Sequence, residues 1–103
     1  MADDKKNEPS SNYMITVRVV VEGHVQGVGF RNHTRRSAIA NDVTGYVRND
    51  ADGTVTMVLQ GDQERVEDVI DDVREGPPLS TVNNLQRHTV DNPSTHKELS
   101  IQR

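Results

Sequence analysis

The sequence of 103 residues contains no cysteine and no tryptophan. Without cysteine the chain can form no disulfide, no thiol nucleophile and no cysteine-ligated zinc or iron–sulfur site. Hydrophobic residues make up only 32% of the chain, and its aromatic residues are Tyr13, Phe30 and Tyr46. This apolar content suffices for one modest core, so length and composition predict a single domain.

Positive charge and long hydrophobic runs are also scarce. Asp and Glu number 16 against 12 Lys and Arg, which gives a net charge of −4. An acidic surface argues against nucleic acid or anionic membranes as partners. No run approaches the length of a membrane span, and residues 1–13 contain no apolar segment of the signal-peptide kind. We therefore expect a cytoplasmic protein in which any anionic ligand is held by a local feature.

Two parts of the chain differ in composition. Residues 1–12 are polar and without periodicity, which predicts a disordered N-terminal tail. From residue 13 onwards the sequence predicts one folded domain that ends at residue 103. Its first strand begins at Met14, where Ile15, Val17 and Val19 alternate with less apolar residues.

The rest of the domain predicts two helices and four further strands. The first helix is expected from about Phe30 to Ala40 or Asn41, with an inner face of Phe30, Thr34, Ala38 and Ile39. The second helix begins after an N-cap at Asp62, follows a stripe of Val66, Val69, Ile70 and Val73, and ends at Gly76-Pro77-Pro78. Strands are expected at residues 44–49, 54–60, 82–90 and 98–102, with a turn at 50–53.

This order, β-α-β-β-α-β plus a short strand, defines the fold class. It predicts an α+β, ferredoxin-like split βαβ sandwich, in which an antiparallel sheet carries both helices on one face. Such a fold hosts many activities, so the function must be argued from a site.

The connection between the first strand and the first helix contains Gly23, Gly27 and Gly29. Glycines allow a tight backbone whose N–H groups point into one concavity, and a following helix N-terminus adds further donors for an anion. Arg31 falls in the first turn of that helix, where a cation is unfavourable unless it serves an anion. The loop therefore predicts anion binding, against the alternative of a glycine-rich turn with no ligand.

Other sites are not supported by the motifs. No Lys-Ser/Thr pair follows the glycines as in a nucleotide P-loop, and the third glycine of a dinucleotide fingerprint is missing. The histidines lack the spacing of a metal site. They are His24, His33, His88 and His96, and His24 is interpreted as a loop residue. No metal and no cofactor are expected.

Two runs resemble the signatures of the acylphosphatase family. VEGHVQGVGFR at residues 21–31 is similar to the first signature, G-x-V-Q-G-V-x-F-R, and GYVRN at residues 45–49 with Gly53 is similar to the second. Both runs match at every fixed position, and the resemblance covers about residues 14–102. It implies hydrolysis of acyl phosphates to a carboxylate and inorganic phosphate by a monomeric enzyme, with phosphate as product and inhibitor.

The resemblance also implies roles for individual residues. Arg31 and the backbone amides of the loop would bind the phosphoryl group, and Asn49 would position the attacking water. The loop amides are those of Val25, Gln26, Gly27, Val28, Gly29 and Phe30. The chemistry is compatible, because a carboxylate with a solution pKa of about 4–5 leaves without a general acid. The water's proton would pass to a phosphate oxygen of the substrate, and Gln26 is expected to brace the loop.

Three other functions are alternatives to this enzyme. A non-catalytic phosphate-binding or regulatory module of the same fold would bind phosphate with negligible turnover. A part in carbamoyl-transfer hydrogenase maturation is disfavoured, because those chains are far longer and carry zinc-finger regions, whereas this sequence has no cysteine. A purely structural or protein-interaction domain explains neither signature.

Overall fold

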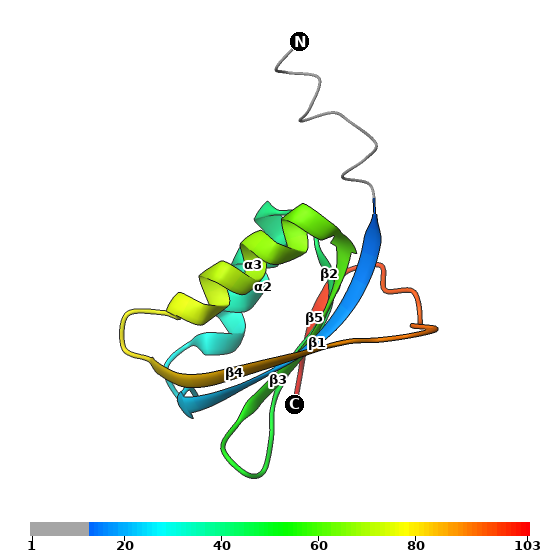
Figure 1. Ribbon diagram of the computed structural model, residues 1–103. Coiled ribbons are helices and arrows are strands. Elements are labelled where there is room, and N and C mark those ends of the chain that lie inside the picture. Colours follow the sequence, from blue (N-terminus) through cyan, green and yellow to red (C-terminus); the bar gives the residue numbers. More distant parts are fainter. Residues whose placement is uncertain (1–12) are drawn as a thin grey trace.

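The computed structural model describes residues 13–103, so the tail predicted for residues 1–12 lies outside the described residues. Two helices lie together on one face of a single sheet (Figure 1). The elements are β1 (Met14–His24), α2 (Phe30–Ala40), β2 (Thr44–Asn49), β3 (Val55–Asp62), α3 (Gln63–Glu75), β4 (Thr81–Thr89) and β5 (Leu99–Gln102). The predicted element order and the ferredoxin-like sandwich are confirmed.

The strand order in the sheet is β4-β1-β3-β2-β5. The antiparallel pairing that we predicted holds for β4 with β1, β1 with β3, and β3 with β2. The short C-terminal strand differs, because β5 pairs parallel with β2 and makes the sheet mixed. This pairing brings the end of the chain next to the start of α2, which matters for the site.

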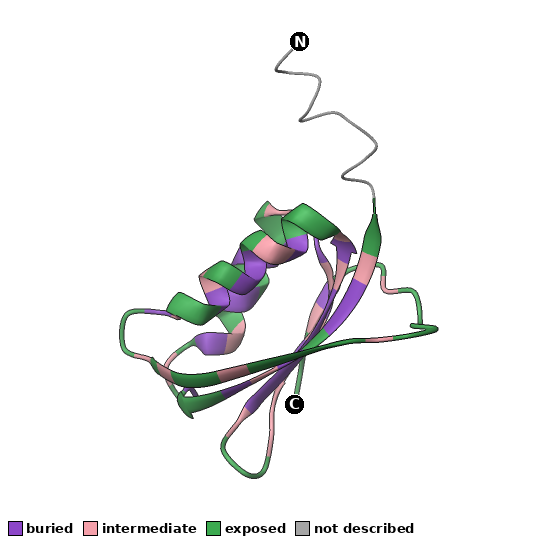
Figure 2. Cartoon of the chain, viewed as in Figure 1, coloured by how far each residue is buried: buried purple, intermediate pink, exposed green. Residues whose placement is uncertain are grey.

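The core lies between the helices and the sheet, where buried residues line the inner sides of both (Figure 2). Val55, Met57 and Leu59 of β3 are fully buried, and the predicted α3 stripe packs against them. The prediction for α2 was wrong at one position: Ile39 is 57% exposed. Ser37 is buried in its place, and its hydroxyl donates to Asp72 of α3 at 2.6 Å.

The predicted element ends are mostly confirmed by local contacts. The Asp62 carboxylate accepts a hydrogen bond from the Glu64 backbone N–H at 3.0 Å, as expected of an N-cap. Strand β3 runs two residues beyond its predicted end, to Asp62. The pairing of β4 with β1 shifts between Glu22 and Gly23, which lie opposite Asn84 and Val82. Neither helix of the described chain is long and apolar enough to cross a membrane.

Candidate active site

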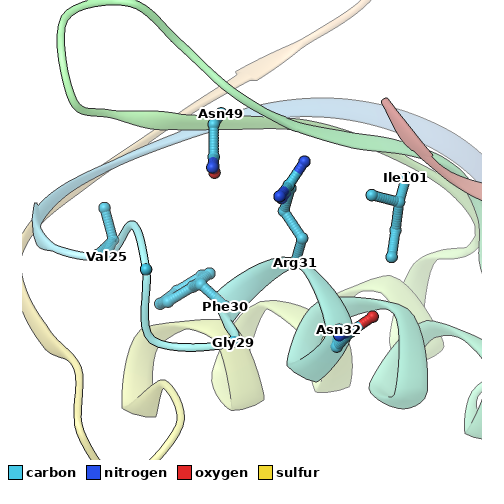
Figure 3. Close-up of a pocket in the computed structure, with 8 residues that line it drawn as sticks. Val25, Gly29, Phe30, Arg31, Asn32, Asn49 and Ile101 are labelled. Carbon is cyan, nitrogen blue, oxygen red and sulfur yellow. The ribbon is translucent and has the colours of Figure 1, made fainter. Parts of the chain in front are cut away.

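A pocket of about 190 Å³ opens where the β1–α2 loop meets the end of β2 and the last strand. Its lining comprises Val25, Gly27, Gly29, Phe30, Arg31, Asn32, Asn49 and Ile101. Figure 3 shows the Asn49 amide and the Arg31 guanidinium converging on the space beside the loop. Most of the residues predicted to form the site, which come from two separate sequence motifs, thus line one cavity.

The backbone of residues 25–30, called the phosphate loop below, has the conformation that the glycines predict. Gly27 has a φ of 77° and Gly29 a φ of 81°, which are left-handed values that other residues adopt only at a cost. Gly29 is the N-cap of α2, and no side chain within residues 13–103 caps this helix. The first N–H groups of an α-helix have no intrahelical partner, and the first three residues of α2, Phe30, Arg31 and Asn32, line the pocket.

Arg31 reaches the pocket from the first turn of α2 and is held at its far end by β5. Its Nη1 donates to the backbone carbonyl of Gln102 at 3.0 Å. A guanidinium has five N–H donors, so this bond fixes its orientation and leaves donors for an anion. No acidic residue lies in the first turn of α2 to neutralise it.

Asn49 is the last residue of β2 and lies on the sheet face that carries the helices. Side chains alternate along a strand, so Asn49 shares its face with Val47, which is fully buried in the core. It pairs with Val55 across the hairpin, and that valine is also fully buried. The strand thus ends with an amide pointed at the pocket rather than at solvent, as Figure 3 shows.

Gln26 connects the phosphate loop to the hairpin that follows Asn49. Its side-chain amide Nε2 donates to the backbone carbonyls of Asp50 and Thr54, at 2.8 and 2.9 Å. These two residues also bond to each other, because the Asp50 N–H donates to the Thr54 carbonyl at 2.9 Å. Gln26 therefore braces the loop as expected, and it does so by fixing the loop against the segment that carries Asn49.

The Asp50 carboxylate holds this hairpin closed. It accepts hydrogen bonds from the hydroxyls of Thr54 at 2.9 Å and Thr56 at 2.5 Å, and from Arg48 Nε at 3.0 Å. Partial burial raises the pKa of Asp50, but the bonds from Thr56, Arg48 and Thr54 outweigh it and lower this pKa below its ordinary value. The same bond with Asp50 raises the pKa of Arg48. Asp50 is therefore ionised at neutral pH and accepts hydrogen bonds from three side chains of the hairpin.

Some predicted residues do not line the pocket. The Gln26 side chain is directed at the hairpin, and Val28 packs on the core. Phosphate binding by the backbone N–H groups of Gln26 and Val28 stays a prediction. His24 does not lie in the loop as predicted: it is the exposed last residue of β1 and pairs with Thr81.

Two lining residues were absent from the predicted site. Asn32 follows Arg31 directly in the sequence, and Ile101 comes from β5. The first could have been found from its place in the opening turn of α2. No local sequence signal places Ile101 there, because its position depends on the parallel pairing of β5 with β2.

No group of three or more His, Asp or Glu side chains within residues 13–103 is arranged to hold a metal ion. His33 contacts the Asp72 carbonyl at 3.0 Å, and the His96 ring lies edge-on to Tyr46. Both histidines therefore have structural partners away from the pocket. Independence from metal stays a prediction that a chelator can test.

Comparison with known proteins places this site in a family. The acylphosphatase family model matches residues 17–101. The acylphosphatase of Pelotomaculum thermopropionicum is 52% identical over 68 residues, which is 66% of this chain and 74% of the relative. The crystal structure of acylphosphatase from Bacillus subtilis has a TM-score of 0.84 and 29% identity, and the match covers 86% of this chain and 99% of that chain.

A third match is the crystal structure of full-length HypF in its phosphate- and nucleotide-bound form. It has a TM-score of 0.83 and 25% identity, and the match covers 89% of this chain but 12% of that one. The family model spans nearly all of the described residues, and both signature runs contribute to one pocket. The chain therefore belongs to the acylphosphatase family.

Proposed function

We propose that this chain hydrolyses acyl phosphates to a carboxylate and inorganic phosphate, with Arg31 and the phosphate loop as the binding site and Asn49 as the residue that positions water. One observation carries the proposal: Arg31 and Asn49, from different elements, line one small pocket together with Gly27 and Gly29. The match to the family model and the relatives named acylphosphatase support the reaction class.

Binding of the phosphoryl group uses main-chain donors and one cation. The loop amides and the first turn of α2 donate to its oxygens, and the free N–H groups of Arg31 add charge-assisted hydrogen bonds. The bond from Arg31 to the Gln102 carbonyl orients the guanidinium before substrate arrives. Such preorganised donors stabilise the charge of the phosphoryl group in the transition state.

Hydrolysis then needs a water placed in line with the bond that breaks. An amide cannot act as a base at neutral pH, so Asn49 orients the water by hydrogen bonding. The water oxygen bonds to phosphorus while the bond from phosphorus to the acyl oxygen breaks. The carboxylate leaves with the electron pair of that bond, and the water's proton passes to a phosphoryl oxygen.

Steady-state hydrolysis of benzoyl phosphate tests these roles. Arg31→Ala and Asn49→Ala should each lower kcat/KM by about 100-fold or more, the loss typical when a transition-state donor is removed. Arg35→Ala is the matched control, because Arg35 is exposed on the same helix and does not line the pocket. Each variant is first checked for the wild-type circular dichroism spectrum. Full activity in folded Arg31→Ala or Asn49→Ala would refute the assigned role.

The same assay separates the enzyme from a phosphate-binding module without turnover. The enzyme releases phosphate with many turnovers per chain, and inorganic phosphate inhibits competitively. A module would bind phosphate but release none from benzoyl phosphate. Excess EDTA should leave the rate unchanged, whereas clear inhibition would indicate a metal ion that the assigned residues do not explain.

We further propose a cytoplasmic monomer. The residues assigned to binding and to water positioning line one pocket within a single chain, so the proposed reaction needs no residue from a second copy. The absence of cysteine is compatible with a reducing compartment. Sedimentation equilibrium should return the chain mass of 11.5 kDa at assay concentrations, and a stable dimer would contradict the proposed monomer.

A further inference from the structure

Two residues of the pocket, Asn32 and Ile101, are assigned no role of their own in the proposed reaction, through either backbone or side chain. In an in-line displacement the leaving group departs on the side of phosphorus opposite the attacking water. With the water at Asn49, the acyl part therefore points away from the end of β2. In Figure 3, Asn32 lies on the first turn of α2, and Ile101 of β5 lies beyond Arg31, away from the phosphate loop. These two residues form the remaining wall.

The charge of this wall restricts what it can accept. Arg31 is the sole charged residue of the pocket among those the structure describes, and the phosphoryl group uses it. Asn32 offers a neutral amide, and Ile101 offers a branched hydrocarbon chain. A second anionic group on the acyl part would meet no cation there, and the molecule around it carries a net charge of −4.

The position of Ile101 suits contact with an apolar group. It pairs with Val47, whose side chain is buried between sheet and helices, so both side chains point to the helix face of the sheet. Unlike Val47, Ile101 is 36% exposed, because β5 is the edge strand beside the pocket. An acyl group that covers Ile101 would remove apolar surface from water.

We propose, on the basis of the proposed function, that this site selects acyl phosphates whose acyl end is uncharged and apolar, with Ile101 as the specificity-determining contact. Acyl phosphates that carry a second negative group are disfavoured. The substrate class is thus set by β5, an element outside both signature runs.

The wild-type enzyme tests the selection directly with benzoyl phosphate and 4-carboxybenzoyl phosphate. These substrates share an aromatic acyl group and differ in a carboxylate at its far end. The expected kcat/KM is higher for benzoyl phosphate by about fivefold or more, the size of a modest binding discrimination. Equal values for the two substrates would overturn the inference.

Variants test the part played by Ile101. Ile101→Ser should lower the ratio of kcat/KM for benzoyl phosphate to that for acetyl phosphate by about three- to tenfold, since the larger acyl group loses an apolar contact. Ile101→Lys should raise the relative rate of 4-carboxybenzoyl phosphate by supplying a cation. Ile39→Ser is the matched control, because Ile39 is an exposed isoleucine outside the pocket. Unchanged ratios in both Ile101 variants would remove Ile101 from the proposal. Ile101→Thr, which keeps the β-branched shape but adds a hydroxyl, serves if Ile101→Ser does not fold.

Failure of this inference differs from failure of the proposed function. If the wild-type chain turns over none of the three substrates, the proposed function is wrong and the selection proposed here is wrong with it. If acetyl phosphate is hydrolysed but the carboxylate makes no difference, the function stands and the selection alone is contradicted.

Discussion

Among single residues, Arg31 depends on two different parts of the chain, the start of α2 and the last strand. Its guanidinium lies beside the uncapped start of α2, and its Nη1 is bonded to the Gln102 carbonyl. A lysine would keep the charge but offers no planar fork that can bond Gln102 and a phosphoryl oxygen together. The arginine is therefore expected to act through geometry as well as charge.

Arg31→Lys tests this distinction. We expect kcat/KM for benzoyl phosphate to fall by about tenfold or more despite the retained charge, because bidentate binding is lost. The control is Arg35→Lys, a charge-preserving change at an exposed position of the same helix. Wild-type kcat/KM in Arg31→Lys would mean that a point charge suffices.

Some residues of the pocket can be predicted from the sequence and others cannot. Arg31 and Asn49 could be assigned because each lies within a short run whose residue types and spacing carry the signal. Ile101 could not be assigned in this way. The sequence of a four-residue strand does not indicate which strand it pairs with, and the parallel pairing of β5 with β2 is a long-range contact. Ile39 was misplaced for a related reason: on a helix with so narrow an apolar face, periodicity alone does not decide which neighbour packs inward.

At the scale of elements, the site depends on the contact between the phosphate loop and the turn of the β2–β3 hairpin. The phosphate loop and the β2–β3 hairpin are distant in sequence, and Gln26 bridges them through the carbonyls of Asp50 and Thr54. The hairpin in turn carries Asn49 at its start. Gln26 therefore fixes the position of the phosphate loop relative to Asn49, and in the proposed reaction this would set the distance between the phosphoryl group and the water.

Gln26→Ala should act on positioning more than on binding. With both bonds lost, the loop still has its amides, so inorganic phosphate should inhibit at a concentration within about threefold of wild type, whereas kcat falls by about ten- to 100-fold. Gln26→Glu, of similar size but without the amide donors, should behave in the same way. If the inhibition constant rises as much as kcat falls, Gln26 supports phosphate binding and its assignment as a positioning residue is wrong.

The hairpin also makes stability depend on pH through Asp50. Its pKa is lower in the folded chain than the ordinary value near 4 that an unfolded chain retains. Its contribution to stability is therefore complete above the unfolded pKa and is lost as pH falls through the folded pKa. Asp50→Asn should lower the free energy of unfolding by about 1–2 kcal/mol at pH 7, since two threonine hydroxyls and Arg48 lose a charged acceptor.

Urea unfolding at pH 7, 4 and 3 measures this effect. The difference in the free energy of unfolding between wild type and Asp50→Asn should begin to shrink below about pH 4, where Asp50 of the unfolded chain becomes protonated. It should shrink further as pH falls towards the lower pKa of the folded chain. Asp68→Asn, at an exposed position of α3, is the control and should differ little from wild type at pH 7. A difference for Asp50→Asn that stays constant between pH 7 and pH 3 would contradict the role assigned to the charge.

For the whole molecule, the order of strands and helices follows from local patterns. The alternation from Met14, the stripe of α3 and the Asp62 N-cap each identify an element without reference to the rest of the chain. The mixed sheet does not follow from such patterns, because the direction in which β5 pairs is decided by where the β4–β5 connection crosses the sheet. That connection places Gln102 and Ile101 beside α2, and so completes the pocket.

The molecule as a whole carries a net charge of −4 and yet is proposed to bind a dianion. Only the local field of the phosphate loop, the start of α2 and Arg31 can account for that binding. Asn49 lies on the opposite wall and is assigned to water rather than to the phosphoryl group. Phosphate binding and water positioning are therefore assigned to two different residues of one pocket.

The most direct test measures the affinity for inorganic phosphate by calorimetric titration, together with kcat for benzoyl phosphate, in wild type, Arg31→Ala and Asn49→Ala. Asn49→Ala should bind phosphate within about threefold of wild type while its kcat falls by about 100-fold or more, and Arg31→Ala should lose both binding and turnover. Wild-type phosphate affinity in Arg31→Ala, or wild-type kcat in Asn49→Ala, would contradict the roles assigned to these residues.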